Sequence, residues 1–140
     1  MLLEPASVVA KAWDHIAAIS AARAPFEHHR LLVTGAGPIG LLAALLGVQR
    51  GLEVHVLDRL ERGPKPDLVR SLGATYHTGS VADVPRPDVV IECTGAPPVV
   101  LEVLTHNASP GIVCLTGVSS GGSLTGVDLG VLNTTMVLEN

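Results

Sequence analysis

The order of hydrophobic and polar residues predicts strands that alternate with helices along most of the chain. Between residues 7 and 22, hydrophobic residues recur at helical spacing with polar residues on the other faces, so we expect a helix capped by Ser7. Residues 30–34 are apolar on both sides, which is typical of a central strand in a parallel sheet. Further strands are expected at residues 53–57, 74–77, 88–93 and 112–116.

Helices are expected in the intervals between these strands. Pro38 suits the first turn of a helix, because proline has no N–H to lose there, and Gly51 suits the end of the same helix. Shorter helices are expected at residues 66–72 and 97–105, and a looser region from Ser119 onward. This order predicts an α/β fold: a Rossmann-type doubly wound parallel sheet of about five strands, without a sixth, with helices on both faces.

The composition argues against several classes of partner. A length of 140 residues, 47% of them hydrophobic, is enough for one domain with a single sizeable core. A net charge of −4, one Trp, one Tyr and one Phe disfavour nucleic acid as a partner. No apolar run reaches the roughly 20 residues that span a bilayer, so no membrane insertion is expected. Cys93 and Cys114 lie in apolar runs without neighbouring Cys or His, as reduced cysteines of a cytoplasmic protein do.

The turn after the first strand contains three glycines, Gly35, Gly37 and Gly40, in the spacing GxGxxG. When such a turn joins a strand to a helix, the first glycine permits the tight turn and the second leaves room for a pyrophosphate. The third lets helix and strand approach closely. Pro38 and Ile39 lie within this turn and belong to the expected cofactor site. The spacing therefore predicts a dinucleotide-binding turn at the N-terminus of a helix.

Asp58 follows the second strand, 18 residues after Gly40, where a carboxylate can accept hydrogen bonds from the adenosine ribose hydroxyls. Such a carboxylate repels a 2′-phosphate, so NAD is the expected cofactor. Arg59 comes next, and Arg62 and Lys65 are nearby, so a cationic rim could accept NADP if Asp58 turned aside.

Two further glycines follow the fourth and fifth strands. Gly95 lies in CTGAPP and Gly117 in LTGVSSGG. Because ligands of open α/β sheets bind at the carboxyl ends of the strands, we expect both glycines to line the cofactor site.

Together these motifs resemble the cofactor-binding domain of the zinc-containing medium-chain alcohol dehydrogenases, over essentially all 140 residues. The matching stretches are LLEPASVVAKAW, VTGAGPIGLLAALL, EVHVLD, LGATY, DVVIECTG and GIVCLTGVSSGG. Within that superfamily the insertion RLERGPKPDLV and the ending MVLEN look most like glucose dehydrogenase. One departure concerns the lysine that many alcohol dehydrogenases place against the adenosine, because that position falls within LERG here.

The resemblance implies hydride transfer between NAD(P) and an alcohol, most specifically the C1 hydroxyl of glucose or a related aldose, with a zinc ion polarising the substrate oxygen. In such families the zinc ligands come mainly from a separate N-terminal domain. Residues 1–29 would be a linker helix from that domain, and residues 30–140 the NAD(P)-binding domain, inactive on its own. Glu4 matches a glutamate that approaches the zinc, although one ligand alone cannot hold the ion. The full-length enzyme is expected to be a cytoplasmic homo-oligomer.

The same resemblance assigns further residues to the cofactor site. Cys93, Thr94, Thr116 and Val118 would line the nicotinamide and its ribose, beside Gly95 and Gly117.

Other combinations of residues support competing functions less well. His28 and His29 have no third metal ligand nearby, and the serines at 119 and 120 lack the GxSxG frame of a hydrolase. Glu92 is expected to be a structural hydrogen-bond acceptor rather than a general base. An S-adenosylmethionine-dependent methyltransferase and a non-enzymatic nucleotide-sensing module remain the alternative functions.

Overall fold

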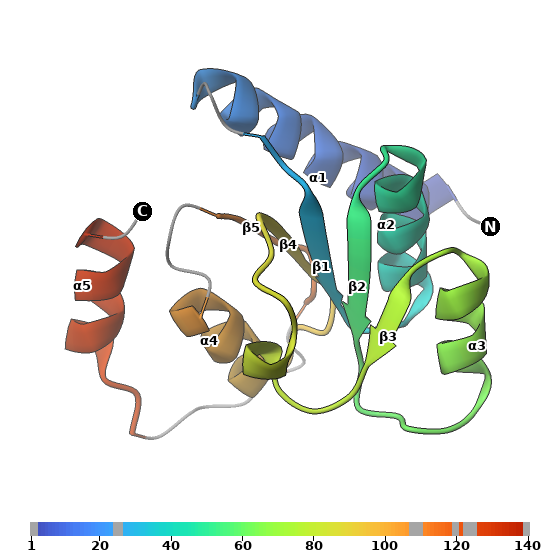
Figure 1. The fold of residues 1–140 in the computed structure, drawn as a ribbon. Coiled ribbons are helices and arrows are strands. Elements are labelled where there is room, and N and C mark those ends of the chain that lie inside the picture. The colour runs from blue at the N-terminus through green and yellow to red at the C-terminus, as the bar shows by residue number, and fades with distance from the viewer. Residues whose placement is uncertain (1–2, 24–26, 107–110, 119–120, 122–125, 139–140) are drawn as a thin grey trace.

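A five-stranded parallel sheet forms the centre of the fold (Figure 1). The computed structural model describes residues 3–23, 27–106, 111–118, 121 and 126–138. Within these ranges the strands are β1 (Arg30–Thr34), β2 (Glu53–Leu57), β3 (Thr75–His77), β4 (Val89–Glu92) and β5 (Ile112–Leu115). Their spatial order is β3-β2-β1-β4-β5, and every neighbouring pair is parallel. The expected doubly wound sheet is confirmed.

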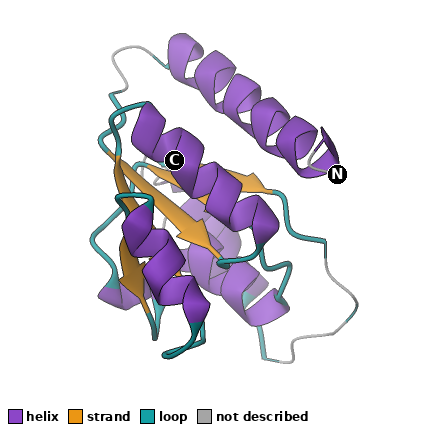
Figure 2. Ribbon diagram, turned by 90° about the vertical axis from the view of Figure 1, so that its right-hand side faces the viewer, coloured by secondary structure: helices purple, strands orange, loops and turns teal. Residues whose placement is uncertain are grey.

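Helices cover both faces of this sheet (Figure 2). They are α1 (Leu3–Ala22), α2 (Pro38–Gln49), α3 (Pro64–Ser71), α4 (Pro97–His106) and α5 (Leu129–Leu138), with a 3-10 turn η1 (Val81–Asp83). Side chains alternate between two cores, because successive strand residues point to opposite faces. Leu31 and Val33 pack in the core that includes residues of α1, α2 and α3, whereas Leu32 packs with Val81 and Val103 of η1 and α4.

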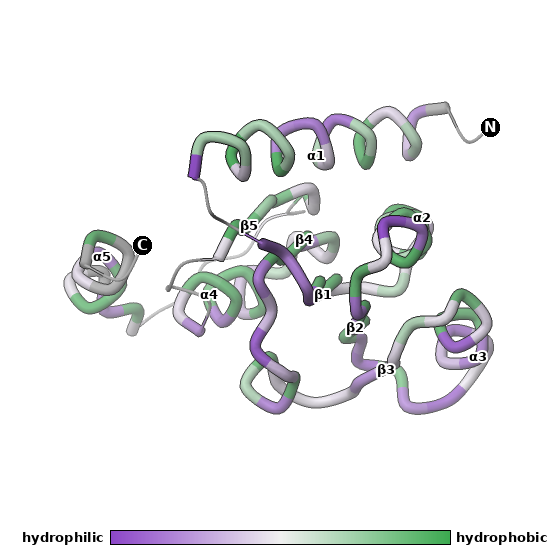
Figure 3. Tube along the Cα trace, turned by 45° about the horizontal axis from the view of Figure 1, so that its top comes forward, coloured by the Kyte–Doolittle hydropathy of each residue, from purple (hydrophilic) through white to green (hydrophobic). Residues whose placement is uncertain are grey.

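The central position of β1 and α2 explains their composition. Leu31, Leu32 and Val33 are all fully buried, as expected for a strand that is covered on both faces. The sequence of α2, PIGLLAALLGVQ, is hydrophobic nearly all round (Figure 3), and the helix contacts α1 on one side and β1 and β2 on the other. A helix enclosed in this way loses the amphipathic pattern of a surface helix.

The first helix begins earlier than predicted. It starts at Leu3 rather than Ser7, and the Ser7 hydroxyl donates to the carbonyl of Glu4 (2.8 Å) instead of capping an N-terminus. The prediction of Ser7 as N-cap was wrong because the helix continues for one more turn. Val9, Trp13 and Ile16 of α1 are buried against the sheet and α2, so this helix shares the main core.

The last helix, α5, lies where the sequence indicated a looser region. Its residues show no single apolar face, and they include Gly130, Val131 and Thr134, which are poor helix formers. The signal that could have revealed it is Asp128, whose carboxylate accepts the N–H of Val131 (3.0 Å) as an N-cap does. The helix contacts α4. Of the described helices, none combines the length and apolar character needed to cross a membrane.

Candidate dinucleotide-binding site

The glycine-rich turn between β1 and α2 has the three steric properties that its spacing predicts. Gly35 adopts a φ of +93°, which L side chains rarely adopt, and its N–H donates to the carbonyl of Leu57 (2.7 Å). A Cβ on Gly40 would lie 1.8 Å from the carbonyl oxygen of Gly35, so the helix can approach the turn only without a side chain there. Around Gly37, by contrast, a Cβ would meet no atom within 4 Å, which leaves open space in front of the helix.

This open space faces the N-terminus of α2. Pro38 is the first helical residue, and Leu41 is the first to donate its N–H back to the turn, to the carbonyl of Gly37 (2.8 Å). The N–H groups of a first helical turn have no partner within the helix, and the helix dipole favours negative charge at this end. The turn can therefore bind a diphosphate through backbone N–H groups.

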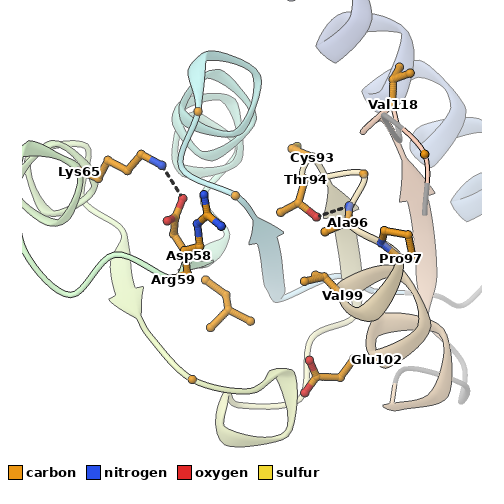
Figure 4. A pocket seen from close by; sticks show the side chains of 16 residues that line it. Asp58, Arg59, Lys65, Cys93, Thr94, Ala96, Pro97, Val99, Glu102 and Val118 are labelled. Atoms are coloured by element: carbon orange, nitrogen blue, oxygen red, sulfur yellow. Dashed lines mark hydrogen bonds and ion pairs between the residues drawn. The ribbon is translucent and has the colours of Figure 1, made fainter. Parts of the chain in front are cut away.

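Asp58, which follows β2, is held by groups from two sides. One carboxylate oxygen accepts the N–H of Ala36 (2.7 Å) and the ammonium of Lys65 (2.8 Å), and the other accepts the N–H of Leu60 (3.2 Å). Burial alone would raise the pKa of Asp58, but the hydrogen bonds from Lys65, Ala36 and Leu60 outweigh it and lower the pKa. The carboxylate thus stays ionised, and its charge is offset by Lys65 (Figure 4).

The loops after β4 and β5 meet on the other side of the turn. They approach each other closely at Gly117, where a Cβ would lie 2.2 Å from the N of Gly95. The Thr116 hydroxyl lies 2.8 Å from the carbonyl of Glu92 and 3.3 Å from the sulfur of Cys93, with geometry suited to donating to either. Burial raises the pKa of the Cys93 thiol to about 11, despite the hydrogen bond from Thr116 that opposes it, so this sulfur is a protonated, unreactive thiol.

These loops enclose a cleft of about 620 Å³ at the carboxyl ends of the strands (Figure 4). Its wall contains eight of the residues that the sequence assigned to the cofactor: Gly35, Gly37, Asp58, Arg59, Cys93, Thr94, Gly95 and Val118. Five others lie outside the wall: Pro38, Ile39, Gly40, Thr116 and Gly117. Gly40 and Gly117 instead shape the cleft from behind, by allowing the close approaches described above.

The sequence did not single out several residues of this wall. Leu57, Gly79, Ala96, Pro97, Val99, Glu102 and Gly121 were missed, and Lys65 was named only as a nearby cation. Glu102 belongs to α4, and its carboxylate accepts the hydroxyl of Ser80 and the N–H of Val81 (2.9 Å). The helical spacing of α4 gives no sign of such a contact, because the contact joins residues from separate elements.

The described residues do not form a metal site by themselves. Among them no group of three or more His, Cys, Asp or Glu side chains could hold a metal ion. Glu4 lies exposed in the first turn of α1, and His29 is 3.4 Å from the carboxylate of Glu27 in an exposed segment. The serines at 119 and 120 lie outside the described residues.

Comparison with known proteins identifies close relatives. The family model described as "Glucose dehydrogenase C-terminus" matches residues 1–140. Glucose 1-dehydrogenase 2 of Vulcanisaeta moutnovskia is 42% identical over 143 residues, a match that covers 100% of this chain and 40% of that protein. Glucose 1-dehydrogenase 1 of Caldivirga maquilingensis is 36% identical, with the same coverage of both chains.

Solved structures show the same relationship. The Haloferax mediterranei glucose dehydrogenase in complex with NADP, Zn and gluconolactone superposes with a TM-score of 0.84 at 32% identity, covering 96% of this chain and 40% of that one. Galactitol-1-phosphate dehydrogenase from Escherichia coli, at 24% identity and a TM-score of 0.69, shares the fold. The chain spans about 40% of the length of these relatives.

Proposed function

Since the chain belongs to the family described as the glucose dehydrogenase C-terminus, we propose that it supplies the NAD(P)-binding part of a zinc-dependent glucose dehydrogenase. The proposed reaction transfers a hydride between the nicotinamide and the C1 hydroxyl of glucose or a related aldose. The observation that carries the proposal is the open space at Gly37, which lies in front of the first turn of α2 and lines the cleft.

The residues of the cleft are suited to the two ends of a dinucleotide. The diphosphate would bind to the N–H groups of the first turn of α2. The adenosine ribose would lie by Asp58, and the nicotinamide by Cys93, Thr94 and Val118. A bound dinucleotide supplies the hydride acceptor or donor. The protein's own contribution is to bind it, to orient it and to exclude water from one face of it.

The cofactor preference depends on Asp58 and the cations around it. A free carboxylate at this position favours NAD. The pairing of Asp58 with Lys65 and the presence of Arg59 in the same wall favour acceptance of the 2′-phosphate of NADP as well. We therefore propose NAD as the cofactor, with NADP as an alternative that can bind in its place; the Haloferax relative was solved in complex with NADP.

The remaining parts of the proposal concern the whole protein. Zinc would be held mainly by residues of a separate domain, as the resemblance to zinc-containing dehydrogenases implies, and Glu4 would approach it. Residues 1–29 would connect the two domains, and residues 30–140 would bind the cofactor. A cytoplasmic location and a homo-oligomeric state belong to the same proposal.

Titration of the purified chain with NADH, NADPH and S-adenosylmethionine tests the proposal. Ligand fluorescence and the melting temperature report binding. We expect both dinucleotides to bind and to raise the melting temperature, because a ligand that binds only the native state stabilises it. Binding of S-adenosylmethionine alone would instead indicate a methyltransferase, and dinucleotide binding without dehydrogenase activity in the whole protein would indicate a nucleotide sensor.

A further inference from the structure

Glu92, the last residue of β4, is a fully buried carboxylate that lies outside the cleft wall. Its exposed fraction is 0%, although the residues that follow it, Cys93 to Gly95, line the cleft. A buried carboxylate is strongly unfavourable unless its oxygens are hydrogen-bonded. The partners of Glu92 therefore indicate what its carboxylate does.

The carboxylate of Glu92 is the acceptor in each of its hydrogen bonds. One oxygen accepts the N–H of Thr94 (2.7 Å) and the hydroxyl of the same residue, and it also lies 3.3 Å from the hydroxyl of Thr34. Both oxygens accept from the N–H of Gly95 (3.2 and 3.1 Å). The Thr94 hydroxyl in turn accepts the N–H of Ala96 (3.0 Å). The loop from Cys93 to Ala96 is thus wound around the carboxylate of Glu92.

The loop after β5 is attached to the same residue. The main-chain carbonyl of Glu92 accepts the N–H groups of Thr116 (2.8 Å) and Gly117 (2.9 Å). Gly117 packs so tightly over the carboxylate that a Cβ on it would lie 2.7 Å from Oε2 of Glu92. Two loops from different strands therefore take their positions from one buried side chain and its own backbone.

We propose that Glu92 is a positioning residue: its carboxylate fixes the loop 93–96, and its main-chain carbonyl holds the start of the loop 116–118, in the shape that receives the nicotinamide end of the dinucleotide. This inference rests on the proposed function. Glu92 lies outside the cleft wall, so it acts through Thr94 and Gly95, which bond to its carboxylate, and through Gly117, which bonds to its carbonyl. Each of the contacts from Thr94 and Gly95 uses a carboxylate oxygen of Glu92 as the acceptor. A carboxamide of the same size can keep an acceptor at the position of Oε1, but it then places an NH2 donor at the position of Oε2, against the N–H of Gly95. The bond from Gly95 to Oε2 is lost and two donors face each other.

Comparison of NADH with ADP-ribose in the variant Glu92→Gln tests the proposal, because ADP-ribose lacks the nicotinamide. We expect the Kd for NADH to rise about tenfold, while the Kd for ADP-ribose changes less than about twofold. The emission of bound NADH should also move toward that of the free dinucleotide. In the unliganded variant, hydrogen exchange of the Thr94 and Gly95 amides should accelerate, while that of the Val33 amide stays slow.

Glu53→Gln is the matched control. It makes the same chemical change at the opposite end of the strands, where Glu53 contacts Arg30 and His55, so it can alter stability without touching the cleft. Its ratio of NADH to ADP-ribose affinity should equal that of the wild type. If Glu92→Gln does not fold, Thr34→Val removes one donor to the same carboxylate, and a smaller shift in the same direction is expected.

The outcomes separate this inference from the proposed function. Parallel weakening of NADH and ADP-ribose, or unchanged affinity for both, overturns the role of Glu92 while the dinucleotide site stands. Unchanged exchange at Thr94 and Gly95 overturns it independently of any ligand. A wild-type chain that binds neither compound overturns the proposed function, and this inference with it.

Discussion

Replacing Gly37 with alanine should separate cofactor binding from folding. Gly37 has an extended backbone (φ −87°, ψ −175°), which alanine adopts without strain, and its Cβ would meet no atom within 4 Å. The methyl group would instead enter the space in front of α2 where the diphosphate is expected. We therefore expect Gly37→Ala to fold normally and to bind dinucleotide poorly.

The expected magnitudes follow from these surroundings. Alanine is a poorer N-cap than glycine, by about 0.5–1 kcal/mol, but it also restricts the unfolded chain, which stabilises the native state by about 0.4–1 kcal/mol. The net change in the free energy of unfolding should stay within about 1 kcal/mol, or roughly 4 °C in Tm. Loss of the close approach of the diphosphate should weaken NADH binding at least tenfold, which corresponds to about 1.4 kcal/mol.

Gly40→Ala is the matched control, because it adds the same methyl group three residues away. There the Cβ would lie 1.8 Å from the carbonyl oxygen of Gly35, so the turn or the helix must shift. Overpacking of this kind costs about 1–3 kcal/mol, and Tm should fall by about 5–10 °C. Thermal unfolding measures the Tm of each variant, and fluorescence titration measures its affinity for NADH. Wild-type affinity for NADH in folded Gly37→Ala would refute the placement of the diphosphate.

Three further predictions concern charge and protonation. Lys65→Met should weaken NADPH binding about fivefold more than NADH binding, because it removes the cation beside Asp58, worth about 1 kcal/mol; an equal change for both dinucleotides contradicts this. Iodoacetamide at about pH 8 should alkylate Cys93 about 100-fold more slowly than an ordinary thiol, since its pKa is raised from 9.0 to about 11, as peptide mass spectrometry can measure. Burial and the neighbouring His55 lower the pKa of His77 below its usual 6.5, so stability is full above about pH 6.5 and falls as the pH drops through that value. Urea unfolding should show this slope, and His77→Gln should flatten it.

The sequence by itself determined the order of the five strands, the helices between them and the position of the glycine-rich turn. All of these depend on local rules: β1 is apolar on both sides because it is buried on both faces, and glycine is required wherever φ is positive or a backbone approaches closely. Gly35, Gly37 and Gly40 each have the surroundings that their spacing predicts. The spacing of the glycines in this one turn is therefore enough to predict all three steric requirements.

The tertiary structure decided which groups share the cleft. The contribution of Glu102 from α4, the pairing of Asp58 with Lys65, and the attachment of two loops to Glu92 all join residues whose distances are set by packing of the sheet. The helix α5 also escaped prediction, because its capping Asp128 precedes a stretch without helical periodicity. Local sequence predicts the backbone conformation of each element. Contacts between separate elements depend instead on how the helices and strands pack in the two cores, which decides which loops meet at the ends of the strands.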